Sequence, residues 1–261
     1  MAYSPTELLT VYLDARGERR KVGRLAFKDL RVLFEYDAPF IASGIEISPI
    51  KLPLRPGVFS ADTTIFDGLF GVFNDSLPDG WGRLLLDRTV EKHGIHRRQL
   101  NPLDQLAYVG PHGMGALSYE PELGFEVADD APLALDKLAE EATAVLEGED
   151  EAVLEELLRL NGSSSGARPK IVVQVCADKK RIIHGRQELQ PGFAHWLIKF
   201  PSSQDAKDVG AIEYAYSLMA KDAGVEMPET HLFRTKRNRY FGTKRFDRAA
   251  TPASTCTASV A

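Results

Sequence analysis

HWLIKFP (195–201) and VGAIEYAYSLMAKDAG (209–224) are the two stretches that decide the fold class of this chain. The first is short and mostly apolar, which predicts a β-strand that ends at Lys199. The second predicts a helix that begins near Asp208 and ends at Gly224, because glycine readily terminates helices. A strand that leads into a helix indicates an α+β architecture here.

Strand signals flank this pair on both sides. A polar, glycine-containing loop feeds an apolar strand in SSSGARPKIVVQV (163–175), and residues 177–180 predict a hairpin turn. After the helix, THLFRTK (230–236) and RYFGTKRF (239–246) predict a final hairpin. The order loop, strand, strand, helix, strand, strand is also that of the small lobe of a protein kinase.

The first half of the chain begins with strands and continues with helices. Alternating apolar residues in LLTVYLD (8–14), with similar signals up to residue 36, predict a small antiparallel sheet over roughly residues 8–48. A helix capped by Asp75 or Ser76 should end at Gly94, and another should follow Pro102. Two amphipathic helices are expected at 135–148 and 150–162, after an acidic joint at 122–132.

Composition places few limits on function. The 261 residues are 44% hydrophobic and 26% charged with a net charge of −5, which is ordinary for a globular protein without general affinity for nucleic acid. Cys176 and Cys256 form neither a disulfide framework nor a metal site. No secretory signal and no apolar run of membrane-spanning length is present, so we expect a cytoplasmic protein that does not bind membranes.

Three features could carry chemistry. The loop 162–170 can present backbone N–H groups to phosphate oxygens, although it lacks the P-loop spacing and could be a simple linker. Lys199 ends an apolar strand, as does the phosphate-binding lysine of kinases, but could be an ordinary edge-strand lysine. Glu213 is placed to pair with that lysine, or to be a surface glutamate near a helix start.

Longer motifs carry a family resemblance. The sequence resembles the HipA family of serine/threonine kinase toxins of type II toxin–antitoxin systems, from about residue 8 to 248. The motifs are FNDSLPDGWGRLLLDR (73–88), SSSGARPK (163–170), HWLIKFP (195–201), IEYAYSLMAKDAGVEMPET (212–230) and FGTKRFDR (241–248).

The resemblance implies a β-rich N-terminal subdomain with helices, followed by a kinase-like small lobe made of an antiparallel sheet and one main helix. It implies ATP and Mg²⁺ as cofactors and a protein target of the aminoacyl-tRNA synthetase class. It also implies a helix-turn-helix antitoxin as partner, with DNA reached only through that antitoxin.

The same resemblance assigns site residues. Ser163 to Lys170 would cover the phosphates, Lys199 and Glu213 would be the kinase pair, and Lys244, Arg245 and Phe246 would form the hinge at the adenine. Ser163 and Ser165 would be regulatory phosphorylation sites. The NDSLPDGWGR motif is assigned to packing within the N-terminal subdomain. The nucleotide-binding residues are then Ser163, Ser164, Ser165, Gly166, Ala167, Lys170, Lys199, Glu213, Lys244 and Phe246.

The sequence departs from the family after the hinge. The boundaries that follow are 1–125 for the N-terminal subdomain, 126–161 for a helical connector, 162–248 for the small lobe and 249–261 for a disordered non-family tail. The large catalytic lobe, its catalytic aspartate and its metal ligands have no counterpart here, and a change of reading frame is one explanation. We therefore expect a truncated chain that is inactive alone, with RYFGTKRF (239–246) exposing apolar surface. The alternative is a non-catalytic binding module for an antitoxin or for a separate catalytic-lobe chain.

Overall fold

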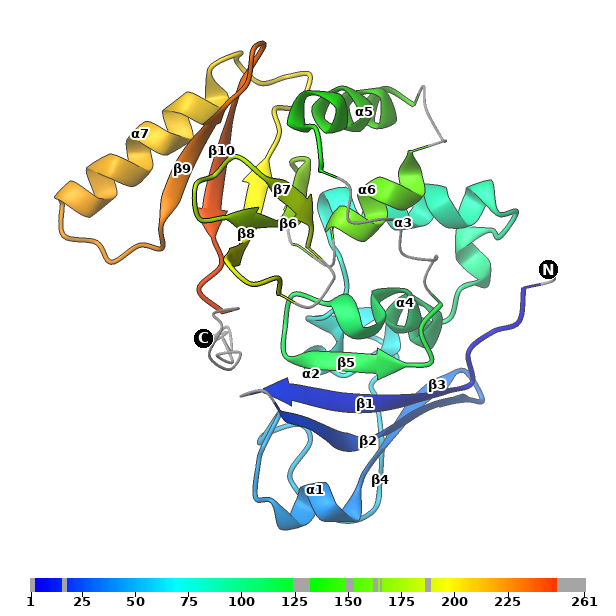
Figure 1. The fold of residues 1–261 in the computed structure, drawn as a ribbon. Helices are drawn as coiled ribbons and strands as arrows, with labels where there is room; N and C mark the ends of the chain where they lie inside the picture. Colours follow the sequence, from blue (N-terminus) through cyan, green and yellow to red (C-terminus); the bar gives the residue numbers. More distant parts are fainter. Residues whose placement is uncertain are drawn as a thin grey trace. The chain divides into compact units, whose positions relative to one another are not determined.

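A computed structural model describes residues 3–15, 18–123, 132–148, 153–161, 164, 166–185 and 189–247 (Figure 1). The described residues form two compact units. The first unit contains the residues up to Pro78 together with 93–123, and the second contains Asp79–Lys92 together with the residues from 132 onward. No helix among these residues is long and apolar enough to cross a membrane. The tail at 249–261 lies outside the described residues.

The first unit is built on an antiparallel sheet with the order β4-β3-β2-β1-β5. Its strands are β1 (Leu8–Ala15), β2 (Glu18–Lys28), β3 (Arg31–Tyr36), β4 (Val58–Ser60) and β5 (Leu117–Glu120). Strand β1 alternates as the sequence predicts, because Leu9, Val11 and Leu13 are buried in one core while their neighbours are more exposed. The sheet is confirmed up to Tyr36, but the predicted extension to residue 48 is wrong.

Helices and helical turns complete the first unit. They are α1 (Ala38–Ala42), η1 (Phe66–Gly68), α2 (Gly71–Asn74), η2 (Arg97–Gln99), α4 (Pro102–Val109) and η3 (Gly110–His112). Helix α4 begins after Pro102 as predicted, and Asn101 caps it by accepting hydrogen bonds from the N–H groups of Leu103 and Asp104. Asp104 is fully buried, and its carboxylate accepts a hydrogen bond from the Asn101 N–H at 2.7 Å. This reciprocal capping fixes the start of the helix.

Helix α3 (Gly80–Lys92) corrects one expectation, its starting residue. It does not begin directly after Asp75 or Ser76, because Pro78 disfavours the helical conformation at the preceding residue. In space, residues 79–92 group with the second unit. The predicted end is confirmed, because Gly94 adopts a positive φ of 74° just beyond the helix.

The second unit contains another antiparallel sheet, with the order β7-β6-β8-β10-β9. Its strands are β6 (Lys170–Cys176), β7 (Ile182–His184), β8 (Phe193–Lys199), β9 (Thr230–Arg234) and β10 (Arg239–Lys244). The predicted amphipathic helices appear as α5 (Leu135–Glu147) and α6 (Leu154–Asn161), and the predicted main helix as α7 (Val209–Asp222). Helix α6 packs against α3 and β6.

A glycine lets α7 approach the sheet closely. A Cβ atom on Gly210 would lie 2.4 Å from the carbonyl oxygen of Arg239, so no larger residue fits without a shift. One helical turn later Glu213 follows on the same side of α7. Ser217, which is buried, contacts the Thr230 hydroxyl at 3.0 Å. These contacts hold the side of α7 that carries Glu213 against β9 and β10.

The apolar surface of the last hairpin differs from the prediction. Tyr240 and Phe241 are buried, because β10 is an inner strand of the sheet, between β8 and β9. The Tyr240 hydroxyl donates to Asp136 of α5 at 2.8 Å. The prediction that RYFGTKRF exposes apolar side chains is therefore wrong for these two residues, whereas Phe246 is 62% exposed.

Candidate functional site

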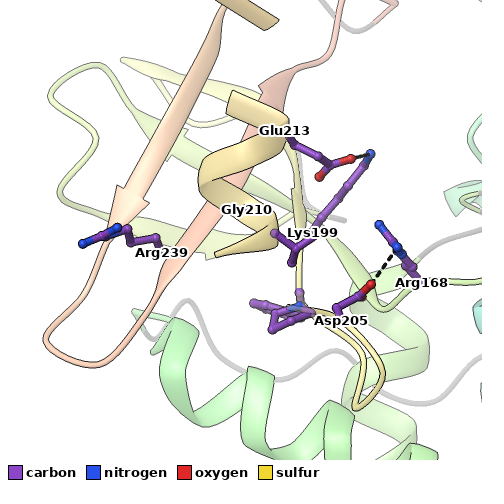
Figure 2. Close-up of a pocket in the computed structure, with 9 residues that line it drawn as sticks. Arg168, Lys199, Asp205, Gly210, Glu213 and Arg239 are labelled. Carbon is purple, nitrogen blue, oxygen red and sulfur yellow. Dashed lines mark hydrogen bonds and ion pairs between the residues drawn. The ribbon is translucent and has the colours of Figure 1, made fainter. Parts of the chain in front are cut away.

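Lys199 and Glu213 meet at one face of the second unit (Figure 2). The ammonium of Lys199, at the end of β8, donates to the Glu213 carboxylate of α7 at 2.6 Å. Their side chains are 32% and 29% exposed, and an ion pair of that exposure stabilises a fold by only about 0.2–1 kcal/mol. The two residues that the sequence singled out are thus brought together where solvent can reach them.

A second lysine lies directly opposite Lys199. Lys170 begins β6 and is the register partner of Lys199, so both side chains project from the same face of the sheet. The Lys170 ammonium is buried and donates to the Gly166 carbonyl at 3.0 Å. Burial lowers its pKa and the Lys199 charge lowers it further, while Asp79 and Glu213 act in the opposite direction. Two facing cations are unfavourable without an anion, which suits a phosphate-binding site.

The loop before β6 is partly described. Gly166 has a positive φ of 105°, and Gly166, Ala167 and Arg168 are exposed. Ser164, by contrast, is buried, and its hydroxyl donates to the Asn161 side chain at 2.7 Å, so it anchors the loop to the end of α6. The predicted residues Ser163 and Ser165 lie outside the described residues.

The predicted hinge, Lys244 to Phe246, begins at the last residue of β10. Lys244 is the register partner of Trp196 on β8 and lies 3.9 Å from the Glu229 carboxylate. Arg245 is buried and forms an ion pair with Asp247, whereas Phe246 points into solvent. Lys199 on β8 and Lys244 on the adjacent strand β10 are therefore three residues, or about 10 Å, apart along the sheet.

A small pocket lies beside the ion pair. It is lined by Arg168, Lys199, Phe200, Pro201, Asp205, Val209, Gly210, Glu213 and Arg239. Its volume of about 10 Å³ has room for roughly one water molecule, so a nucleotide would have to lie over the open face rather than inside it. Lysine ammonium groups and a glycine-containing loop fit phosphate groups.

The residues of this pocket fit a metal ion less well than a phosphate group. The carboxylates that line the pocket are Asp205 and Glu213, and each is already bound to a cation. Across the described part of the chain, no cluster of three or more metal-binding side chains is found.

The sequence does not predict two carboxylates that contact the loop, Asp205 and Asp79. Arg168 pairs with Asp205 at 2.6 Å, and Figure 2 shows this contact between the loop and the segment before α7. The pKa of Asp205 is lowered, first because it accepts a hydrogen bond from the Ser202 N–H. Asp79 accepts a hydrogen bond from the N–H of Gly166, 87 residues along the chain. No local pattern marks contacts of such long range.

Comparison with known families identifies both halves of the chain. Residues 9–120 match the HipA N-terminal domain, and residues 162–260 match the HipA-like C-terminal domain. The chain belongs to the HipA-like toxin family. The match to the N-terminal domain includes residues 79–92, although they lie with the second unit in space, and the C-terminal match extends into the segment 249–261.

A solved structure has the same fold as this HipA-like chain. It is HipA from the Shewanella oneidensis MR-1 toxin–antitoxin system, in a complex with HipB and operator DNA. The TM-score is 0.58 at 20% sequence identity, and the match covers 95% of this chain and 52% of the other. The HipA-like chain therefore spans about half the length of the structure that it matches.

Proposed function

We propose that this chain provides the ATP-holding part of a HipA-like serine/threonine protein kinase. The observation that carries the proposal is the 2.6 Å contact between Lys199 and Glu213. In kinases, a strand lysine that binds the nucleotide phosphates is oriented by a glutamate of the neighbouring helix. Lys199 on β8 and Glu213 on α7 have those positions.

The surrounding sheet supports the same assignment. Three strands precede α7 and two follow it, in the spatial order β7-β6-β8-β10-β9, which is the arrangement expected of a kinase small lobe. The residues Gly166 and Ala167 would cover the phosphates, and Lys170 would stabilise that loop through its hydrogen bond to the Gly166 carbonyl. The backbone of Lys244 to Phe246 would meet the adenine. Lys199 would neutralise phosphate charge while Glu213 holds its ammonium in place.

The catalytic step itself is not assigned to these residues. Phosphoryl transfer needs a residue that orients the attacking hydroxyl and carboxylates that hold Mg²⁺. The described carboxylates at the pocket are engaged with Lys199 and Arg168. Magnesium binding, and the phosphorylation of a serine or threonine on a target protein of the aminoacyl-tRNA synthetase class, are proposed from the family resemblance, for a full-length HipA-like kinase.

ATP binding to the purified chain tests the proposal. We expect calorimetry to detect binding that Lys199→Ala weakens at least about tenfold, since a charge-assisted contact is lost. The matched control is Lys236→Ala, which removes the same charge from the exposed turn between β9 and β10. Equal binding by the Lys199→Ala variant, or an equal loss in Lys236→Ala, would show that Lys199 does not hold the nucleotide.

A partner is proposed on the same basis. The matched HipA structure is bound to HipB and operator DNA. We propose a HipB-like helix-turn-helix antitoxin as the partner of this chain, with DNA contacted through the antitoxin. The net charge of −5 agrees with this arrangement, because an acidic chain has no general attraction to DNA.

A second candidate function is a binding module without catalysis. It is favoured by the outward face of α7, where Ile212, Tyr216 and Met219 follow one another at helical spacing and are 47%, 66% and 62% exposed. Apolar stripes of this kind usually mark a contact with another chain. The occupant would be an antitoxin or a separate catalytic-lobe chain.

A double variant tests whether α7 is the binding surface. Replacing Tyr216 and Met219 by serine should leave ATP binding intact and abolish complex formation with a HipB-like antitoxin in sedimentation velocity. If the double variant still forms the complex, α7 is not the binding surface.

A further inference from the structure

Asp79 and the first two residues of helix α3, Gly80 and Trp81, form a helix-starting turn that binds the peptide groups of Gly166 on both sides. The Asp79 carboxylate accepts a hydrogen bond from the Gly166 N–H, and the Trp81 N–H donates to the Gly166 carbonyl at 3.1 Å. The same carbonyl accepts the Lys170 ammonium at 3.0 Å. Both backbone polar groups of Gly166 are therefore bound, one to a charged acceptor and the other to two donors.

Gly80 makes this close contact possible. It has a positive φ of 43°, and a Cβ atom there would lie 2.8 Å from the Gly166 carbonyl and from the Ala167 Cα atom. Only glycine combines that backbone conformation with such close approach to another backbone. The backbone of the turn therefore packs directly against the backbone of the loop, and this contact restricts the movement of the loop relative to the turn.

The turn is carried by a well-anchored helix. Helix α3 packs against α6, and Lys92 at its end forms an ion pair with Glu155 of α6 at 3.2 Å. Arg88 of α3 also donates to the carbonyl of Val145 in α5. These contacts connect the turn to the helices that precede the loop, so that it forms a rigid support.

The loop residues beyond Gly166 are not held in the same way. Ala167 and Arg168 are exposed, and among the described residues their N–H groups have no hydrogen-bond partner. Arg168 is tied to Asp205 only through its side chain. Two adjacent N–H groups on a fixed glycine turn are suited to binding an anion.

We propose that the Asp79–Gly80–Trp81 turn is the positioning element of the phosphate loop. It fixes the peptide groups of Gly166, so that the N–H groups of Ala167 and Arg168 are presented to a nucleotide phosphate in one conformation. The proposal rests on the nucleotide function proposed above. Asp79 acts through the loop and is a positioning residue.

Hydrogen exchange of the loop, measured by mass spectrometry on the whole chain, tests the positioning directly. In Asp79→Ala, amide exchange in a peptide containing Gly166 should accelerate about tenfold, because a hydrogen bond to a charged group is lost. Asp79→Asn retains an acceptor of the same size and should change exchange by less than about threefold. The control Glu91→Ala removes an exposed carboxylate from the same helix and should have no effect.

Calorimetry with ATP gives the second readout. Asp79→Ala should bind ATP about tenfold more weakly at an unchanged melting temperature, with affinity largely restored in Asp79→Asn. Unaltered loop exchange in Asp79→Ala would overturn the proposal, as would equal losses of affinity in the Ala and Asn variants. If the unmutated chain does not bind ATP, the nucleotide function fails, and the exchange experiment alone still decides whether Asp79 positions the loop.

Discussion

Replacing Gly210 by alanine should separate α7 from the sheet and weaken the Lys199–Glu213 contact. The added Cβ atom would lie 2.4 Å from the Arg239 carbonyl oxygen and 3.1 Å from the Phe241 nitrogen. Both neighbours are backbone atoms of β10, so they cannot rotate away, and α7 must shift outward. Glu213, one turn further on the same side, would move with it.

The magnitude follows from two opposing effects. Overpacking of this kind costs about 1–3 kcal/mol. Alanine is favoured over glycine inside a helix by up to about 1 kcal/mol, and by less near the helix start, where Gly210 lies. We therefore expect Gly210→Ala to lower the free energy of unfolding of the second unit by about 1–2 kcal/mol.

The assay is urea unfolding followed by tryptophan fluorescence. The chain has two tryptophans, Trp81 and Trp196, and both are buried in the second unit, so their signal reports that unit selectively. A control in the first unit is Gly115→Ala, where the added Cβ atom meets no atom within 4 Å and the tryptophan signal should not change. A Gly210→Ala variant that is as stable as the original chain and binds ATP equally well would refute the reasoning.

Two further predictions concern buried or engaged carboxylates. Asp104→Ala should destabilise the first unit by about 2–4 kcal/mol in calorimetric melting, because the N–H groups of Thr6 and Asn101 lose their acceptor; a loss below about 1 kcal/mol would contradict this. The lowered pKa of Asp205 predicts stability that is fully present above pH 3.8 and is lost as the pH falls through the lower pKa of the folded state. In Asp205→Asn this acid-dependent loss should be smaller, and an unchanged pH profile of tryptophan fluorescence melting would count against the assignment.

The local part of the fold could be predicted from sequence. The strand ending at Lys199 and the helix ending at Gly224 are set by short-range periodicity and by a terminating glycine, and both are found where predicted. The order of strand and helix also predicts that Glu213 pairs with Lys199, as in kinases, and the two side chains are in contact at 2.6 Å. These features need no knowledge of distant residues.

The remaining features depend on tertiary contacts that periodicity does not encode. The three-residue strand β4 follows a stretch rich in proline and glycine, which conceals it. The hydrogen bond between Asp79 and Gly166 joins residues far apart in sequence. The buried position of Ser164 depends on its hydrogen bond to Asn161 at the end of α6. A serine-rich loop alone does not show which hydroxyl faces inward.

The central claim is that ATP lies on the face of the second unit that carries Lys199, the loop and the hinge. Amide chemical shifts from two-dimensional NMR, recorded on the deuterated chain during titration with ATP, test it most directly. The account predicts that the largest shift changes fall on Gly166, Ala167, Lys199 and Phe246. Shift changes confined to the first unit, or none at saturating ATP in a folded chain, would contradict it.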